Sequence, residues 1–272
     1  MDNRKHIHHS TRHFGFSYPT SLSSKLHSAF TPVVILIAIF LLLRFFTIIP
    51  FAPSSIAPAT ILEALLATFI RLAVAYALAV IIAIPLAILV NHSALMERLL
   101  LPAFDIAQSI PVLAFFPLII IVFIHFGFTD AAAVFIIFLS MLWNIVFSLV
   151  GGIKTIPNDI KDAARVFGIR GTDYVRRILL PATIPYLVTG SLLAWAQGWN
   201  IIIVAEVLHT YIPGGTPSQD LFGIGSLLVN ATARGENGVF VIAIFAMVIT
   251  IALLNFFVWQ KLLRFAERFK FE

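Results

Sequence analysis

Three charged residues lie within long apolar stretches of the sequence, where ionisable side chains are rare. Arg44, in the outer third of the stretch 30–51, is expected to extend its charged end to the membrane interface. Arg71 falls in the apolar stretch 64–90, and Glu206 lies near the end of the stretch 184–208. A charge in the hydrocarbon region of a membrane is costly, so it requires a partner, water or a nearby interface. We therefore expect Arg71 and Glu206 either to form a structural ion pair or to line a path for a solute.

Four uncharged polar or aromatic residues in the apolar stretches could also contact a solute directly. They are Gln108, Asn144, Trp199 and Asn200. An asparagine in a membrane helix more often bonds a neighbouring helix than a ligand. These residue types therefore allow both a solute pathway and ordinary helix packing.

The sequence carries no pattern that is typical of catalysis or of metal binding. An ATPase needs a glycine-rich phosphate loop that ends in Gly-Lys-Ser/Thr, and in the run 151–155 the lysine does not follow a glycine directly. No His-Glu-x-x-His or serine-elbow pattern is present, and Cys is absent. We expect a non-catalytic chain that holds neither a metal nor a cofactor of its own.

The elements that position these residues are apolar stretches long enough to cross a membrane. Of the 272 residues, 60% are hydrophobic and 11% are charged, whereas a soluble domain averages about 25% charged residues. A helix of about 20 apolar residues spans the hydrocarbon core. Six stretches qualify as spans, namely 30–51, 64–90, 106–126, 131–150, 184–208 and 239–260.

Lys and Arg are distributed unevenly between the segments that join these spans. Fifteen of them fall in the tail 1–29, the 91–105 and 151–183 loops and the C-terminal tail, whereas the alternate loops hold only Arg234. Because cytoplasmic segments collect Lys and Arg, we expect both termini to be cytoplasmic, with a tail at 1–29 and a transmembrane domain at 30–272. The same rule explains the net charge of +5 without nucleic acid.

The 151–183 loop is predicted to contain a helix, a glycine turn and a second helix. Asn158 is a suitable N-cap for the first helix, and Gly168 is suited to end it. Gly171 restarts a helix, which Pro181 is expected to close before the fifth span. The apolar stripe of the first helix contains Ile160, Ala163, Ala164 and Phe167. Such a basic, amphipathic hairpin could rest on lipid headgroups or dock onto a protein.

The spacing in this loop resembles the signature loop of ABC importer permeases. The matching residues are Asp162-Ala163-Ala164, Gly168, Ile178 and Leu180-Pro181. The family pattern begins Glu-Ala-Ala, so Asp162 keeps the charge and shortens the reach. Other positions resemble the nitrate/sulfonate/taurine branch, namely Arg71, Gln108-Ser109-Ile110-Pro111, Pro117, Thr189-Gly190, Trp195, Trp199-Asn200 and Ala205-Glu206. Ala75 and Ala87 depart from this branch, which often has glycine at both places.

This resemblance implies an all-α bundle of six transmembrane helices, similar to the MetI-like permeases of type I importers, in the bacterial inner membrane. It implies that the 151–183 loop is a coupling-helix hairpin that docks into a cytoplasmic ATPase subunit, which itself binds ATP and Mg²⁺. A second permease subunit, identical or different, and an external solute-binding protein would complete the assembly. The residues implied in coupling are Asp162, Ala163, Ala164, Arg165, Gly168, Ile169, Arg170, Gly171, Tyr174, Leu180 and Pro181.

An autonomous channel or secondary transporter is a second interpretation of the same topology. It predicts transport without an ATPase and a 151–183 loop that tolerates substitution. The lack of a clear internal repeat weighs against it, because many secondary transporters are built from paired halves. A membrane-embedded enzyme or scaffold is a third interpretation, but no convergent catalytic residues support an enzyme. The sequence does not name the solute, although Arg71 favours a small anion such as nitrate, a sulfonate or taurine.

Overall fold

The computed structural model of the chain describes residues 56–269, and every regular element in that range is a helix. All described residues belong to one compact unit of the chain. The predicted tail 1–29 and the predicted span 30–51 lie outside the described residues. The predicted all-α class is confirmed for the part that is described.

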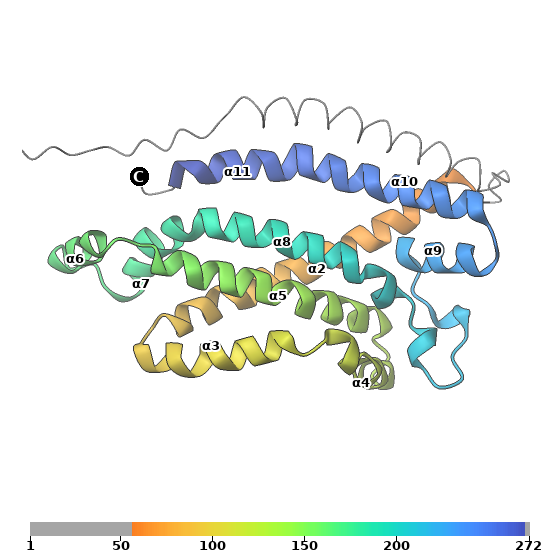
Figure 1. The fold of residues 1–272 in the computed structure, drawn as a ribbon, viewed down its shortest axis with the longest axis horizontal. Helices are drawn as coiled ribbons and strands as arrows, with labels where there is room; N and C mark the ends of the chain where they lie inside the picture. The colour runs from red at the N-terminus through yellow and green to blue at the C-terminus, as the bar shows by residue number, and fades with distance from the viewer. Residues whose placement is uncertain (1–55, 270–272) are drawn as a thin grey trace, which may run out of the picture. The chain divides into compact units, whose positions relative to one another are not determined.

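Long helices lie alongside one another in this unit, with α5 packed against both α2 and α8 (Figure 1). Within the described range, four helical runs are long and apolar enough to cross a membrane, and a bent pair of helices could supply a fifth span. The four runs are α2 (Pro58–Val90), α5 (Thr129–Lys154), Gly171–Glu206, which ends in α8 (Leu180–Glu206), and Asn237–Phe269, which contains α10 (Asn237–Leu254) and α11 (Gln260–Ala266).

Small side chains let these helices approach closely. Ala75, Ala79, Ala83 and Ala87 follow one another at four-residue spacing along α2, and all four are buried in the core. Helix interfaces in membranes favour such residues because backbones can then pack closely. The alanines at positions 75 and 87, where the resembled branch often has glycine, therefore fit the packing.

The predicted span at 106–126 is broken near its start by a sharp bend. The chain forms two helices there, α3 (Ala94–Ser109) and α4 (Val112–His125), which meet at 83°. Ile110 is extended at φ −76° and ψ 122° because the proline ring of Pro111 disfavours helical backbone in the residue before it. The predicted 91–105 loop is also mostly helical, and Ser93 caps α3 by accepting a hydrogen bond from the Met96 amide at 3.2 Å.

The second helix of the predicted hairpin continues into α8, so Pro181 does not close it as expected. The four-residue helix α7 (Gly171–Tyr174) is followed by a π-helical turn at Val175–Leu179, and α8 starts directly afterwards. A π turn changes the hydrogen-bond register of a helix. Pro181 lies just after this π-helical turn, and it lacks the N–H that would continue the regular hydrogen-bond pattern.

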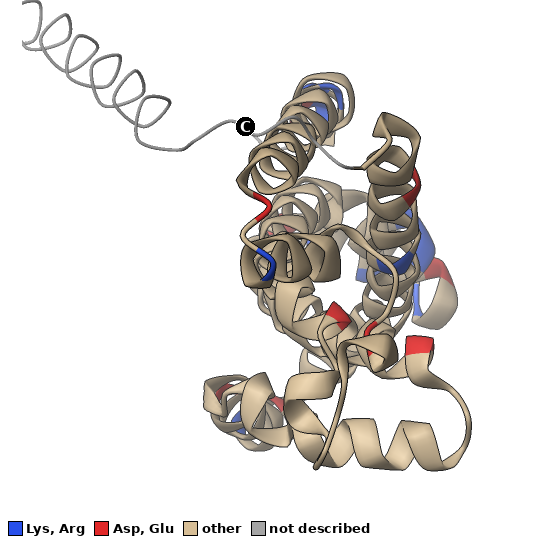
Figure 2. Ribbon diagram, turned by 90° about the vertical axis from the view of Figure 1, so that its right-hand side faces the viewer, with Lys and Arg blue, Asp and Glu red and all other residues tan. Residues whose placement is uncertain are grey.

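The two ends of the helices differ in what they carry (Figure 1). We call the end with α6 (Asn158–Val166) and α7 the hairpin end, and the end with α9 (Ile224–Ala233) the opposite end. Figure 2 looks at the opposite end and shows that charged residues occupy only a few places along the ribbon. The remaining short elements are 3-10 turns at His209–Tyr211, Pro217–Gln219 and Glu267–Phe269.

Candidate functional site

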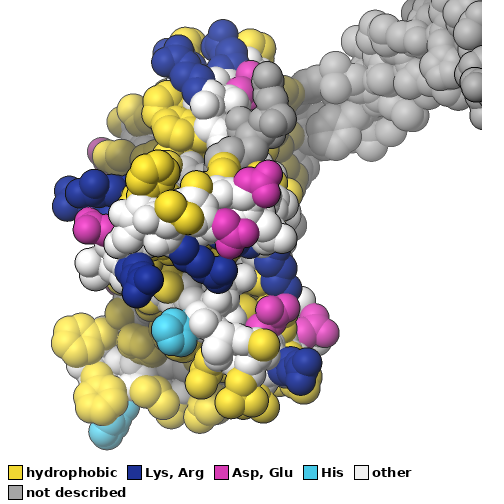
Figure 3. Space-filling model, turned by 90° about the vertical axis from the view of Figure 1, so that its left-hand side faces the viewer, with side chains coloured by type: hydrophobic (Ala, Val, Ile, Leu, Met, Phe, Trp, Pro, Cys, Tyr) yellow, Lys and Arg dark blue, Asp and Glu magenta, His cyan; other side chains and the backbone are white. Residues whose placement is uncertain are grey.

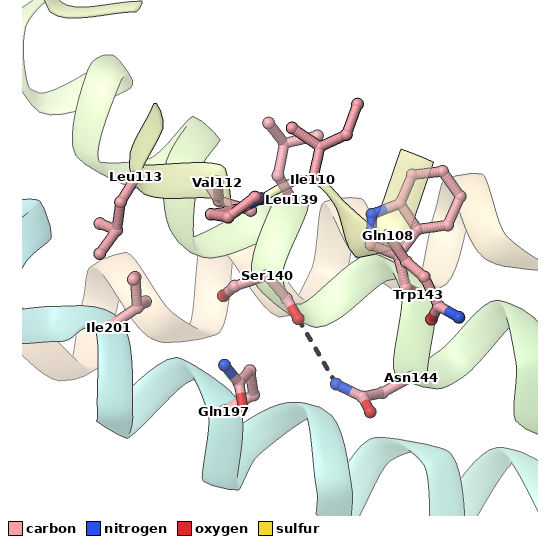
Figure 4. A pocket seen from close by; sticks show the side chains of 11 residues that line it. Gln108, Ile110, Val112, Leu113, Leu139, Ser140, Trp143, Asn144, Gln197 and Ile201 are labelled. Atoms are coloured by element: carbon pink, nitrogen blue, oxygen red, sulfur yellow. Dashed lines mark hydrogen bonds between the residues drawn. The ribbon is translucent and has the colours of Figure 1, made fainter. Parts of the chain in front are cut away.

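A cavity of about 420 Å³ lies at the break between α3 and α4. Its walls come from that break, from the middle of α5 and from α8 (Figure 4). The extended backbone at Ile110 and the bend at Pro111 separate two helices that would otherwise continue in line. The lining residues are Gln108, Ile110, Pro111, Val112, Leu113, Leu139, Ser140, Trp143, Asn144, Gln197 and Ile201.

The polar groups in this cavity are all uncharged. Asn144 Nδ2 donates to the Ser140 backbone oxygen at 3.4 Å, and Gln108 Nε2 donates to Asp105 Oδ1 at 2.9 Å. The Gln197 amide forms no hydrogen bond with any described residue. Figure 4 shows Gln197 rising from α8 and Asn144 extending from α5 into the same space. The cavity therefore offers amide groups that a solute could bind.

The structure brings together two of the predicted pathway residues and separates the other four from them. Gln108 and Asn144 line the cavity, whereas Trp199 is buried in the core, and Asn200 is exposed but outside the cavity lining. Gln197 and Ser140 were missed as candidates. Spacing could have indicated Ser140, because it lies one turn before Asn144 on α5, whereas no polar lining residue one turn away on α8 points to Gln197.

Arg71 and Glu206 lie in a polar cluster at the opposite end, and their expected approach is confirmed. Arg71 Nη1 lies 2.9 Å from Glu206 Oε1, and Glu206 is fully buried. The carboxylate also accepts hydrogen bonds from Thr68 Oγ1 at 2.6 Å and from the Gly225 amide at 2.8 Å. A buried carboxylate is tolerated only with such complete pairing.

The rest of the Arg71 guanidinium is also occupied. Its Nε donates to Asp130 Oδ1 at 2.8 Å, and its Nη1 donates to the Phe222 carbonyl at 2.9 Å. The cluster therefore contains one arginine and two carboxylates and joins α2, α5, α8 and the start of α9. The arginine that favoured an anionic solute from sequence already has two carboxylate partners, and it does not line the cavity.

The first turn of α9 closes this cluster. The amide of Ile224 donates to Thr68 Oγ1 at 2.9 Å, and the next amide, of Gly225, donates to Glu206. Negative charge at a helix N-terminus is favourable because free N–H groups point outward there. Gly223 precedes the helix, and a Cβ at this position would collide with the Glu206 carboxylate. The backbone at Gly223 and the first turn of α9 therefore pack directly around the buried Glu206 carboxylate.

The hairpin end holds the predicted coupling residues. Helix α6 begins at Asn158 with Pro157 at the N-cap, so the expected side-chain cap by Asn158 is wrong. The predicted glycine stop is confirmed, because Gly168 has φ +70°. The Gly168 amide donates to the Arg165 carbonyl at 3.1 Å and the Ile169 amide to the Ala164 carbonyl at 2.8 Å, a Schellman ending.

The apolar stripe predicted for α6 divides into two faces. Ala164 is buried and Ile160 is partly buried, so these residues pack inward. Ala163 is exposed, and the side chains of Val166 and Phe167 are 84% and 79% exposed. Figure 3 shows this end of the molecule, where hydrophobic, basic and acidic side chains are mixed on one surface. The hairpin thus presents an unpaired apolar tip.

The other predicted coupling residues surround this tip or form the hairpin's second arm. Arg165 pairs with Asp162 at 3.1 Å, with both side chains largely exposed. Arg170 is the N-cap of α7, and Gly171 has φ +59°. Tyr174 is partly buried beside a cavity of about 870 Å³ beneath the hairpin. The residues that are only partly exposed are Ile169, Tyr174, Leu180 and Pro181.

Comparison with known proteins identifies the family. The family of binding-protein-dependent transport system inner membrane components matches residues 75–263. The matched region covers most of the chain, from α2 to α11, and includes the cavity and the hairpin. The chain belongs to this family of membrane-embedded permease components.

Similar proteins come from several transport systems. A nitrate import permease protein of Leptolyngbya laminosa is 35% identical over 68% of this chain and 62% of its own length. A bicarbonate transport system permease protein of Synechococcus elongatus is 32% identical over 55% of this chain and 52% of its own length. The taurine transport system permease protein of Escherichia coli is 26% identical over 57% and 56%. The matches thus span about half to three fifths of these relatives.

A solved structure shows a similar fold. A chain of the MetNI methionine ABC transporter, in an inward-facing form, superposes with a TM-score of 0.65 at 18% identity. The superposition covers 77% of this chain and 97% of that chain. The expected MetI-like fold is therefore confirmed. At 18% identity, this comparison shows a shared fold and nothing about the solute.

Proposed function

We propose that this chain is the transmembrane subunit of an ATP-driven importer for small anions. Its family and its fold support a permease role. The relatives named for nitrate, bicarbonate and taurine transport support a solute that carries a negatively charged oxygen group. ATP and Mg²⁺ bind a partner ATPase in this proposal, since the sequence carries no phosphate loop.

The exposed apolar tip at Val166 and Phe167 is the observation that carries the proposal. Large apolar side chains that project beyond the bundle on a charged hairpin are typical of a protein contact surface. The tip is held by a defined glycine ending, so it can transmit force as a rigid element. It is therefore suited to dock onto an ATPase and to move with it.

The remaining subunits follow from the same proposal. Two permease copies form the pathway, two ATPase subunits bind the hairpins, and an external protein delivers the solute. The hairpin end is cytoplasmic because it carries the basic hairpin and the basic C-terminal segment, including Lys261 and Arg264. Import is then alternating access between two states that are biased by ligands on opposite sides.

Replacing Phe167 with alanine tests the coupling role. We expect Phe167→Ala to weaken ATPase binding about tenfold, because a well-packed apolar anchor contributes strongly to an interface. Phe126→Ala is the matched control, since Phe126 is 67% exposed and lies at the far end of α4. The measurement is co-purification of the ATPase with the permease, together with ATP-dependent uptake.

Two outcomes would reject the proposal. Equal ATPase binding by Phe167→Ala and Phe126→Ala would remove the docking role. Uptake that continues without an ATPase would favour an autonomous channel or secondary transporter.

A further inference from the structure

The cavity at the α3–α4 break has no charged side chain in its lining. Its polar groups come from Gln108, Ser140, Asn144, Gln197 and Trp143, and all other lining residues are apolar. Its volume of about 420 Å³ lies within the range of roughly 300–1,000 Å³ that is usual for small-molecule sites. A solute in it would therefore meet hydrogen-bonding groups but no counter-charge.

Several N–H donors in this cavity are available. The Gln197 amide has two N–H groups and no hydrogen-bond partner in the described part of the chain. Asn144 uses one N–H on the Ser140 carbonyl at 3.4 Å and keeps a second. The indole of Trp143 packs against the Phe104 ring at 5.5 Å, and its N–H has no partner among residues 56–269. Donors from α5 and α8 thus converge on one space (Figure 4).

The charged cluster around Arg71 at the opposite end is poorly suited to bind an anion. Arg71 is already bound to Glu206 and to Asp130, so an incoming anion would compete with two carboxylates. Arg71 also does not line the cavity at the α3–α4 break, so an anion in that cavity would meet neutral donors only.

We propose that this cavity is a transit site for a small oxyanion group, which binds neutral N–H donors of Gln197, Asn144 and Trp143. The inference rests on the proposed import function and adds the site and its mode of recognition. Hydrogen bonds from neutral N–H donors to a charged oxygen are stronger than those between neutral groups, so several such donors can hold an anion together. Because no fixed positive charge holds the anion, it can also leave, as transport requires.

Uptake by the complete transporter tests this site. Cells that express the chain with its ATPase and solute-binding partners would be given labelled nitrate, bicarbonate or taurine. Gln197→Glu places a negative charge in the cavity with little change in shape, and we expect it to reduce oxyanion uptake by more than tenfold. Gln197→Leu removes the donors alone, and we expect a loss of about tenfold.

The matched control is Gln260→Glu, because Gln260 is an exposed glutamine at the start of α11 and outside the cavity. We expect its uptake to stay within about twofold of the unmodified protein, since surface substitutions have small effects. Membrane abundance and ATP hydrolysis stimulated by the binding protein would show that each variant is folded and coupled. The Gln197 variants should keep both.

The outcomes separate the two proposals. If the unmodified transporter imports one of the three ions and Gln197→Glu imports it equally well, the cavity is not the site, and the importer function stands. If Gln197→Glu loses uptake while Gln197→Leu does not, the anion passes close to residue 197 and is repelled by the added carboxylate. Hydrogen bonding of the anion by the Gln197 amide is then rejected. If the unmodified transporter imports none of the three, the proposed class of solute fails.

Discussion

Arg71 on α2 and Glu206 at the end of α8 meet at 2.9 Å, in a site where the carboxylate has no exposure to solvent. The same carboxylate receives the Gly225 amide from the first turn of α9 and the hydroxyl of Thr68. One buried acid therefore fixes two long helices and the short helix between α8 and α10. The Arg71–Glu206 pair therefore has a structural role, because it holds α2, α8 and α9 together at the opposite end of the bundle.

Replacing Glu206 with glutamine should strongly destabilise the protein. The substitution keeps the shape but removes the charge that faces Arg71, and breaking a buried ion pair typically costs about 3–5 kcal/mol. Because Arg71 retains Asp130, we expect the lower end of this range. The measurement is the thermal unfolding midpoint of the purified protein in detergent.

Asp130→Asn provides the comparison for this experiment. The Asp130 side chain is 68% exposed, although it lies 2.8 Å from Arg71. An exposed ion pair usually contributes about 0–1 kcal/mol, so a small change is expected. Equal midpoints for the Glu206→Gln variant and the unmodified protein would show that the pair does not stabilise the fold.

Gly223→Ala should disturb the same cluster through shape alone. Gly223 has extended backbone at φ −177°, which any residue adopts, but an added Cβ would collide with the Glu206 carboxylate. Overpacking of this kind usually costs about 1–3 kcal/mol. Gly151→Ala is the matched control, because nothing lies within 4 Å of the Cβ position and the residue is helical. Thermal midpoints that fall equally would contradict this account.

The apolar stretches predicted most of the helices, but the chain's departures from straight helices were hard to predict. The span 64–90 corresponds to α2, and 131–150 corresponds to α5, because long apolar runs in lipid have little alternative to helix. Pro111 produced a sharp break, whereas Pro117 lies inside α4 without ending it. Proline removes one donor in both cases, but only the residue before Pro111 leaves the helical backbone, and the apolar pattern does not distinguish the two prolines.

The candidate site was only partly accessible from sequence. Arg71 and Glu206 could be paired because charges in apolar stretches need partners. Thr68 and the amides that begin α9 could not be assigned to Glu206, because those contacts depend on how a loop folds back. Gln197 was missed for a similar reason, since a single amide in an apolar helix does not reveal which cavity it faces.

Gly190→Ala should destabilise the contact between α5 and α8 more than Gly198→Ala does. An added Cβ at Gly190 would lie 2.7 Å from the Ser148 Cβ and 3.1 Å from the Asn144 backbone oxygen. At Gly198 it would meet the ends of the Met141 and Leu72 side chains, which can move aside. We expect a loss of about 1–3 kcal/mol at Gly190 and a smaller one at Gly198. Thermal midpoints measured in one detergent would rank the two, and the reverse order would contradict the packing argument.

Gly168→Val should impair coupling while leaving the bundle stable. Gly168 has φ +70° with open space around it, so valine would strain only the turn, by about 1–2 kcal/mol. That strain would shift the exposed tip at Val166 and Phe167 relative to the second arm. We therefore expect lower ATP-dependent uptake and weaker ATPase association, with a thermal midpoint that falls by only a few degrees. Gly168→Asn is the control, because asparagine tolerates left-handed backbone and should retain most uptake. Full uptake by both variants would show that the geometry of this turn is not required for coupling.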